Sequence, residues 1–303
     1  MRLQGLHHIT MITADAQRNV DFYAGVLGLR LVKRTVNFDD PGVHHLYYGD
    51  ETGSPGTILT FFPYPGARAG RHGAGQAEEI AFAVPAGSLG FWQERLAGLG
   101  IAVGGPTARV GERLIAVKDP DGLMLGRAAE GIPAGHAIRG FRGITLWVED
   151  PAATARVLAE VLGYQAGPVE GSRSRFVHPG DGLGRIVDLR AVKGFWSGAM
   201  GAGVVHHVAF RAADDAIQAA ATASLAPRGT RVPPQQDRNS SRSTYSREPG
   251  GVLSESAPDA PGFAIDEPVE ALGTRLMLPA RYEPHRAAIE AALPRLRPAR
   301  DAA

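Results

Sequence analysis

Two pairs of adjacent histidines, His7-His8 and His206-His207, are the residues of this sequence best suited to metal chemistry. Each pair lies in an alternating apolar run, GLHHITMIT or GVVHHVAFRA, that predicts a strand. A carboxylate, Glu255, follows a Pro-Gly-Gly turn near the end of the chain. Two imidazoles and one carboxylate are the smallest set that holds an octahedral metal on one face, as in non-haem Fe(II) oxygenases. Adjacent strand residues face opposite sides, so one histidine of each pair should bind the metal, and either one could.

These residues stand at equivalent places because the chain repeats one unit four times. Each unit predicts a strand, a helix and three further strands, separated by turns rich in Gly and Pro. The first strands of the four units cover residues 5–13, 77–85, 139–148 and 203–212. Units one and four carry the His pairs, whereas units two and three have Glu78-Glu79 and Arg142-Gly143. Gly126 occupies in unit two the place of Glu255 in unit four. A purely structural repeat needs no such pairs, so we predict a metal shared by units one and four.

The repeats also predict how the chain is divided. We expect an N-terminal pair of modules over residues 1–128, a C-terminal pair over 139–270, and a tail over 271–303 with a short helix. Asp15, and Asp150 before Pro151, predict helix N-termini. Because the metal-binding set is divided between units one and four, those two units should form one cup and units two and three another.

Composition limits the remaining possibilities. The 303 residues are 44% hydrophobic and 21% charged, which is typical of a soluble globular protein. A net charge of +1 argues against nucleic acid and against a charged membrane surface as partners. Without Cys, any metal must bind to His and carboxylates. No run approaches the roughly 20 apolar residues that span a bilayer, and we expect a cytoplasmic protein, with a homo-oligomer left open.

Long runs of this sequence resemble the vicinal oxygen chelate (glyoxalase/bleomycin resistance/dioxygenase) superfamily, and within it the ring-cleaving dioxygenases of hydroquinone type. The runs include GLHHIT, KDPDGL, VVHHVAFR, REPGGVL and PGFAIDEP, and the resemblance spans nearly the whole chain. It implies an α+β fold, with four βαβββ modules forming two cup-shaped mixed sheets (the vicinal oxygen chelate fold). It also implies Fe(II) held by the second His of each pair and the Glu after the turn, which here are His8, His207 and Glu255.

The same resemblance places five further residues near the metal as catalytic residues: His7, Thr10, His206, Arg238 and Tyr245. Thr10 agrees with the strand pattern, because residues two apart project from the same face. Arg238 could hold an anionic oxygen of a substrate, and Tyr245 could exchange a proton with it.

Two features of the sequence differ from that assignment or stand outside it. Where the family usually has aromatic residues around the last hairpin, this chain has Ser240, Ser241, Ser246 and Ser254. We expect the smaller side chains to widen or wet whatever they line, or to weaken its packing. A third pair, His44-His45, has no partner carboxylate in another unit, and we interpret it as structural.

The leading hypothesis is an Fe(II)-dependent extradiol-type dioxygenase that opens hydroquinone-like rings with both atoms of O₂, in aromatic compound degradation. Its partners would be a small aromatic substrate and O₂. A catechol extradiol dioxygenase is the alternative among enzymes, and Mn is the alternative metal. A glyoxalase-like isomerase fits less well, because that chemistry uses two His and two Glu and TILTFFPY lacks the second carboxylate. A metal-free protein that sequesters small molecules is the alternative from another class.

Overall fold

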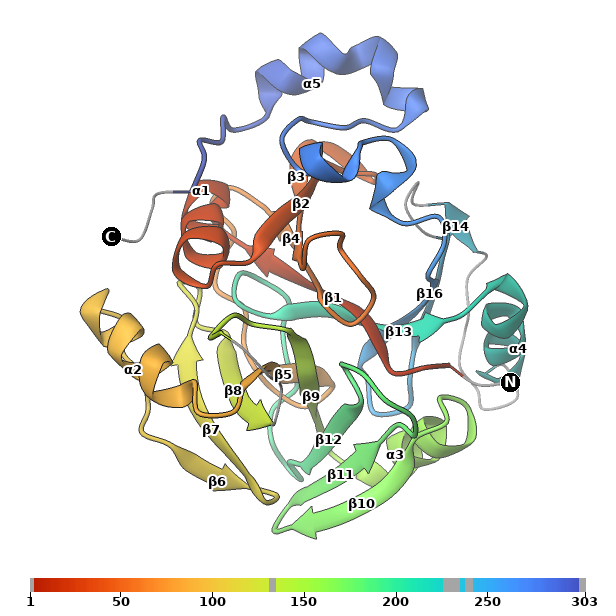
Figure 1. Ribbon diagram of the computed structural model, residues 1–303. Helices are drawn as coiled ribbons and strands as arrows, with labels where there is room; N and C mark the ends of the chain where they lie inside the picture. The colour runs from red at the N-terminus through yellow and green to blue at the C-terminus, as the bar shows by residue number, and fades with distance from the viewer. Residues whose placement is uncertain (1–2, 131–134, 226–234, 238–241, 300–303) are drawn as a thin grey trace.

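Four modules of one strand, one helix and three strands follow one another along the chain (Figure 1). The computed structural model describes residues 3–130, 135–225, 235–237 and 242–299. Module one has β1 (Leu6–Thr13), α1 (Ala16–Val20) with its π-helical continuation η1 (Asp21–Val26), β2 (Arg30–Asn37), β3 (Asp40–Gly49) and β4 (Ile58–Pro63). Module two has β5 (Gln76–Pro85), α2 (Leu89–Gly98), β6 (Thr107–Arg109), β7 (Glu112–Lys118) and β8 (Met124–Glu130).

The second half of the chain repeats the order. Module three has β9 (Gly140–Val148), α3 (Pro151–Glu160), β10 (Gln165–Glu170), β11 (Arg173–Val177) and β12 (Ile186–Ala191). Module four has β13 (Val205–Ala212), α4 (Asp215–Leu225), β14 (Gln236–Asp237), β15 (Arg242–Arg247) and β16 (Leu253–Pro258). The tail contains η3 (Phe263–Ile265), η4 (Val269–Ala271), η5 (Ala280–His285) and α5 (Arg286–Ala292). The predicted α+β fold of four βαβββ modules is confirmed.

The modules pair across the two halves of the chain. One sheet has the strand order β14-β15-β16-β13-β1-β4-β3-β2, and the other has β10-β11-β12-β9-β5-β8-β7-β6. Modules one and four therefore share one sheet and modules two and three share the other, as the divided metal-binding set requires. Each sheet is joined at its centre by two antiparallel first strands, β1 with β13 and β5 with β9. The boundaries 1–128 and 139–270 stay a prediction.

Local sequence signals set the helix starts. The carboxylate of Asp15 accepts a hydrogen bond from the amide of Arg18, 2.9 Å away, and Asp150 accepts one from Ala152 ahead of α3, whose first residue is Pro151. Both predicted N-caps are confirmed. Gly28, at φ +70°, ends the first helical segment in a conformation that favours glycine. The tail contains a short helix as predicted, α5, which begins at Arg286.

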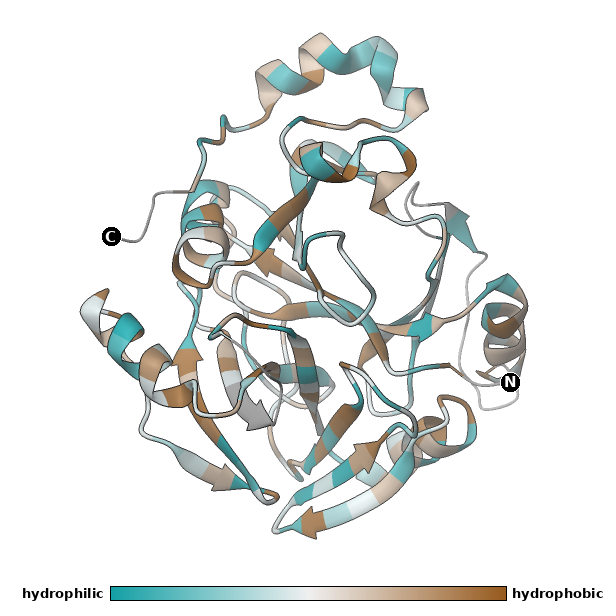
Figure 2. Ribbon diagram, viewed as in Figure 1, coloured by the Kyte–Doolittle hydropathy of each residue, from teal (hydrophilic) through white to brown (hydrophobic). Residues whose placement is uncertain are grey.

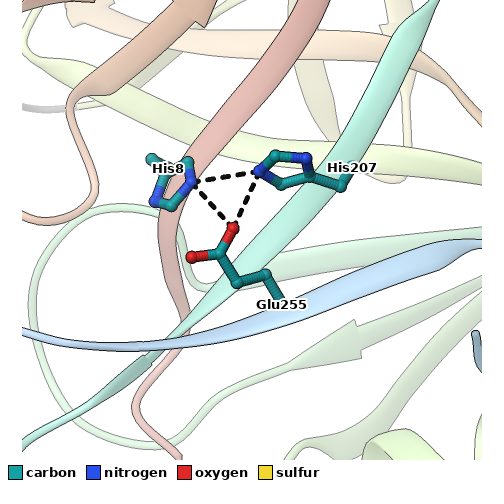
Figure 3. A group of neighbouring side chains, drawn as sticks. All are labelled: His8, His207 and Glu255. Atoms are coloured by element: carbon teal, nitrogen blue, oxygen red, sulfur yellow. Dashed lines mark hydrogen bonds and ion pairs between the residues drawn. The ribbon is translucent and has the colours of Figure 1, made fainter. Parts of the chain in front are cut away.

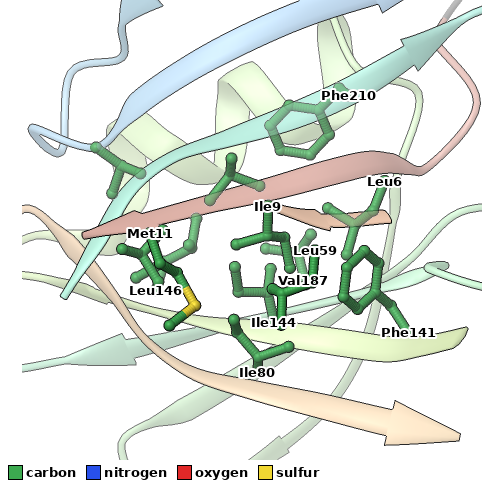
Figure 4. Packing of buried hydrophobic residues seen from close by; sticks show 14 of the residues in the cluster. Leu6, Ile9, Met11, Leu59, Ile80, Phe141, Ile144, Leu146, Val187 and Phe210 are labelled. Atoms are coloured by element: carbon green, nitrogen blue, oxygen red, sulfur yellow. The ribbon is translucent and has the colours of Figure 1, made fainter. Parts of the chain in front are cut away.

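The central strand β1 separates the hydrophobic core from the site. Leu6, Ile9 and Met11 point toward the second sheet, where they pack with residues of β9 and β12 (Figure 4). Figure 2 shows hydrophobic residues on the central strands β1 and β12, and many hydrophilic ones on the outlying α5. Each large apolar side chain buried in this way contributes about 1.5–3 kcal/mol. The alternate residues His8 and Thr10 must then project from the opposite, concave face.

The tail covers the outer strands of the first sheet. Leu278, Ile289 and Leu293 pack on Val36 of β2, and α5 lies above this sheet in Figure 1. The buried ammonium of Lys33 forms ion pairs with Asp266 and with Glu267, the latter at 2.9 Å. These ion pairs hold the segment that follows η3 against β2. Among the described residues, no helix combines the length and apolar character needed to cross a membrane.

Candidate metal centre

Strand register brings the candidate ligands together on the concave face of the first sheet. Across four neighbouring strands, Tyr245, Glu255, Ala209 and His8 form one row of backbone partners. His207, Thr10, Thr60 and Tyr47 form the next row, from β13 to β3. Side chains in neighbouring rows of one face lie close together, so residues distant in sequence meet in one place.

A bulge lies at each histidine pair. The partner of Leu6 is Phe210 and the partner of His8 is Ala209, so His7 is the extra residue on β1. In the same way His207 pairs with Thr10 and Val205 with Met11, which makes His206 the extra residue on β13. In regular alternation two adjacent side chains project from opposite faces of the sheet. A bulge can turn one of them so that both project toward the same face. With these bulges, His7, His8, His206 and His207 all line one cavity.

The side chains of His8, His207 and Glu255 converge on one point (Figure 3). The Nε2 atoms of the two histidines are 3.2 Å apart, and Glu255 Oε2 lies 2.8 Å from that of His207 and 3.3 Å from that of His8. Ligand atoms at right angles around a metal, with bonds of about 2.1 Å, lie about 3 Å apart. The three separations therefore fit one triangular face of an octahedral metal.

The carboxylate of this group is deeply buried and its orientation is fixed. Ser243 Oγ donates to Glu255 Oε1 at 2.5 Å, which leaves Oε2 directed at the two histidines. Burial raises the pKa of the Glu255 carboxyl, but the adjacent His8 and His207 outweigh it and hold the pKa well below its usual range. The group is an ionised hydrogen-bond acceptor of the kind that suits a cation.

The other ring nitrogens of the two converging histidines contact the neighbouring histidine of each pair. Nδ1 of His8 is 3.0 Å from Nδ1 of His7, and Nδ1 of His207 is 2.8 Å from Nδ1 of His206. In each contact one nitrogen must donate and the other accept. Burial and the neighbouring His8 lower the pKa of His7 to about 3, so His7 is neutral at ordinary pH. If Nδ1 of His8 and His207 carries the proton, both Nε2 lone pairs point at the convergence, which suits metal ligation.

A cavity of about 580 Å³ opens above this group. Of the residues expected near the metal, His7, Thr10, His206 and Tyr245 all line it, and Arg238 lies outside the described residues. The Tyr245 ring meets the His207 ring edge to face at 5.4 Å. Thr10 is fully buried and its hydroxyl is 2.8 Å from that of Thr60.

Two cavity residues, His45 and Tyr47, were not anticipated from the sequence. The structural interpretation of the third pair holds for His44, whose Nε2 lies 2.8 Å from the carbonyl oxygen of Pro294 in the tail. For His45 that interpretation stays untested, and this residue faces the cavity from the opposite side of β3. The signal available in the sequence was the spacing of His45 and Tyr47, two apart on one predicted strand.

The serines of the last hairpin do not widen this cavity where they are described. Ser246 and Ser254 line a separate space of about 30 Å³, bordered by apolar residues of α3 and α4. That volume suffices for a water molecule in a polar site. Ser240 and Ser241 lie outside the described residues.

The second sheet has ion pairs at the places that hold the converging group in the first. By register, Glu79 and Gly143 stand at the places of His8 and His207, and Asp188 pairs with Thr145 as Glu255 pairs with Ala209. Asp188 accepts hydrogen bonds from Arg175 at 2.9 Å and from Arg173 at 3.1 Å. Arg109 pairs with Glu79 at 2.5 Å. Guanidinium groups thus supply the positive charge beside these carboxylates.

Comparison with known proteins agrees with this architecture. The sequence model of the Glyoxalase/Bleomycin resistance protein/Dioxygenase superfamily matches residues 5–126. The chain is 45% identical to MhqO of Bacillus subtilis (strain 168), a ring-cleaving dioxygenase by provisional name, over 96% of each chain. It is 32% identical to the chlorohydroquinone/hydroquinone 1,2-dioxygenase of Sphingobium indicum, over 93% of each chain.

Solved structures give the same result. A crystal structure of a provisionally named dioxygenase from Bacillus subtilis superimposes with a TM-score of 0.94 at 44% identity, covering 98% of both chains. Glyoxalase I of Zea mays superimposes with a TM-score of 0.65 at 15% identity, covering 84% of this chain and 92% of its own, and so shares the fold alone. The full-length similarity and the shared module order lead to one conclusion: the chain belongs to the glyoxalase/bleomycin resistance protein/dioxygenase superfamily, and within it to the family of these ring-cleaving dioxygenases.

Proposed function

We propose that this protein is an Fe(II)-dependent ring-cleaving dioxygenase that inserts both atoms of O₂ into hydroquinone-like aromatic diols. The observation that carries the proposal is the convergence of His8, His207 and Glu255 at the floor of a cavity large enough for a small aromatic molecule. The full-length relatives, one of them a hydroquinone 1,2-dioxygenase by name, support the same reaction.

In this proposal His8, His207 and Glu255 are the metal ligands. Fe(II) held there would supply open coordination positions and the redox chemistry that a reaction with O₂ requires. The protein's own part is orientation and proton transfer. His7 and His206 fix the rings of the two ligand histidines through their Nδ1 contacts.

Three cavity residues remain for the substrate. Tyr245, His206 and Thr10 all border the space beside the ligands, and the first two can accept or donate a proton as the substrate hydroxyl ionises and the ring opens. Arg238 stays a proposed partner for an anionic oxygen of the substrate.

One position argues against a glyoxalase-like site with four ligands. Glu255 pairs with Ala209, two residues after His207, and the matching residue in module one is Thr60, which pairs with Thr10. A second carboxylate would have to stand at Thr60. A hydroxyl there leaves more of the metal open to substrate and O₂.

A metal-free binding protein is also disfavoured. Glu255 is 2% exposed and ionised, and burying such a charge is costly unless a cation or strong hydrogen bonds compensate. A metal bound at the convergence would supply such a cation. The absence of Cys agrees with a reducing compartment, and we propose that the enzyme works in the cytoplasm.

The test is metal analysis and oxygen uptake of protein purified without O₂ and supplied with Fe(II) or Mn(II). We expect iron to bind and oxygen to be consumed with hydroquinone but not with catechol. Oxygen uptake with catechol alone would favour the catechol-cleaving alternative. Activity with Mn(II) alone would show that the metal is manganese. Absence of metal binding would overturn the proposal.

A further inference from the structure

A chain of hydrogen-bonding groups runs along the cavity wall away from the metal centre. The hydroxyl of Thr10 is 2.8 Å from that of Thr60, whose oxygen is 2.9 Å from His45 Nε2. On the other side of the same ring, His45 Nδ1 is 2.8 Å from the Tyr47 hydroxyl. The chain therefore begins at Thr10, passes through Thr60, which occupies the place of Glu255 in module four, and ends at a phenol that lines the cavity.

Hydrogen-bond chemistry allows two directions along this chain, one for each tautomer of His45. A neutral imidazole has one donor and one acceptor nitrogen, so His45 can accept from the Tyr47 hydroxyl and donate to Thr60. Thr60 then donates to Thr10. In the reverse direction His45 donates to Tyr47, whose hydroxyl proton can then be donated to a ligand. In either direction the Tyr47 hydroxyl can form a hydrogen bond with a ligand in the cavity.

The same residues form an aromatic wall. The His45 ring lies 4.1 Å from the ring of Tyr47 and 4.2 Å from that of Phe62. Phe62 meets the His206 ring edge to face at 5.7 Å, and Tyr47 meets Phe263 in the same way at 5.2 Å. An aromatic ligand that lies along this wall has its faces and edges in contact with rings from the metal centre to Tyr47.

The positions of the strands determine how far Tyr47 lies from the metal centre. Thr10 on β1, Thr60 on β4 and Tyr47 on β3 share one row, and neighbouring strands are about 4.8 Å apart. Tyr47 thus stands two strands away from the strand that carries His8. A catechol presents both hydroxyls at one side of its ring, whereas a para-diol that binds the metal through one hydroxyl directs the other across the ring, away from the metal.

We propose that Tyr47, held by His45, forms a hydrogen bond with the distal hydroxyl of a para-diol and so selects this substrate class over catechols. The inference rests on the proposed function and names the group that recognises its substrate. Tyr47 contacts the substrate, and His45 is a positioning residue that acts through Tyr47.

The experiment measures ligand affinity by calorimetry with the Fe(II)-loaded protein in the absence of O₂. The two ligands are hydroquinone and 4-methylphenol, which replaces the distal hydroxyl by a methyl group of similar size. Native protein should bind hydroquinone more tightly. Tyr47→Phe should weaken hydroquinone binding roughly three- to tenfold, the range for one neutral hydrogen bond, and leave 4-methylphenol unchanged. His45→Leu should also weaken hydroquinone binding. His45→Gln, whose side chain can still form a hydrogen bond with Tyr47, should restore part of the affinity for hydroquinone.

Tyr64→Phe is the matched control, because Tyr64 lines the same cavity and its hydroxyl accepts from Asn37 instead of joining this chain. It should leave the preference for hydroquinone unchanged. An undiminished preference in Tyr47→Phe would overturn the inference, as would an equal loss for both ligands. If native protein cleaves hydroquinone while this result is obtained, the proposed function stands and only the role of Tyr47 fails. If native protein cleaves no para-diol, the proposed function itself fails.

Discussion

At the scale of single residues, the account depends on the charge and position of Glu255. Its carboxylate is the anionic member of the converging group, and the Ser243 hydroxyl fixes which oxygen faces the histidines. Glutamine has nearly the same shape and no charge. The two roles of Glu255, filling space and carrying charge, can therefore be separated.

We predict that Glu255→Gln folds normally but loses most of its iron and its turnover, because a neutral amide is a poor ligand for a hard cation. The measurements are iron content, circular dichroism and oxygen uptake. Ser254→Ala is a suitable control, because Ser254 neighbours Glu255 in sequence but lines the small separate space. Full iron and full activity in Glu255→Gln would remove this residue from the ligand set.

A second residue-scale prediction concerns proton transfer. Tyr245→Phe and His206→Ala should each keep iron and lower kcat with hydroquinone by about 10²-fold, the usual scale for a lost acid–base group. Steady-state kinetics together with iron analysis separate this outcome from loss of the metal. Unchanged kcat in both variants would exclude them from the mechanism.

At the scale of elements, the sequence predicts the modules and the histidine strands well because both are local patterns. Alternation and turn residues locate β1 and β13, and comparison of the repeats singles out the residues that only modules one and four carry. The role of His45 could not be predicted in this way, since it depends on which face of β3 lines the cavity. That face is decided by the pairing of β3 with β4 and by the tail that covers His44.

The residues of the second sheet that correspond to the converging group were likewise not predictable from the sequence. Asp188 stands at the place of Glu255, but its strand follows an irregular glycine-rich turn that does not align with the Pro-Gly turns of the other modules. Only strand pairing shows the equivalence. Its partners, Arg173 and Arg175, lie on β11 and are recognisable as partners only once the strands are placed.

We predict that Arg175→Met lowers the free energy of unfolding by about 1.5–3 kcal/mol, because it removes charge-assisted hydrogen bonds to the buried Asp188, which keeps its bond from Arg173. Iron content should not change, because the metal centre lies in the other sheet. Arg242→Met, which removes a half-exposed ion pair with Asp215, is the matched control and should cost at most about 1 kcal/mol. Equal effects in thermal or urea denaturation would contradict the structural role of the buried pairs.

At the scale of the whole molecule, four similar modules yield one converging group of metal-binding type among the described residues. Pairing of modules from opposite halves of the chain brings two histidines and a carboxylate together in one sheet. In the other sheet, arginine side chains accompany the equivalent carboxylates.

We therefore predict one iron per chain, with iron raising the melting temperature of native protein and leaving that of Glu255→Gln nearly unchanged. The stabilisation follows because the metal binds the folded state and not the unfolded chain. Metal analysis combined with thermal denaturation, before and after chelation, checks both parts. Two iron atoms per chain would show that the second sheet also binds metal.

The most direct test of the central claim is isotope incorporation from ¹⁸O₂ into the product formed from hydroquinone by the iron-loaded protein. The account predicts a ring-opened product that carries both oxygen atoms of one O₂ molecule, and no such product from Glu255→Gln. Formation of benzoquinone without incorporated label would contradict it, since that outcome would mean oxidation of the diol without cleavage of its ring.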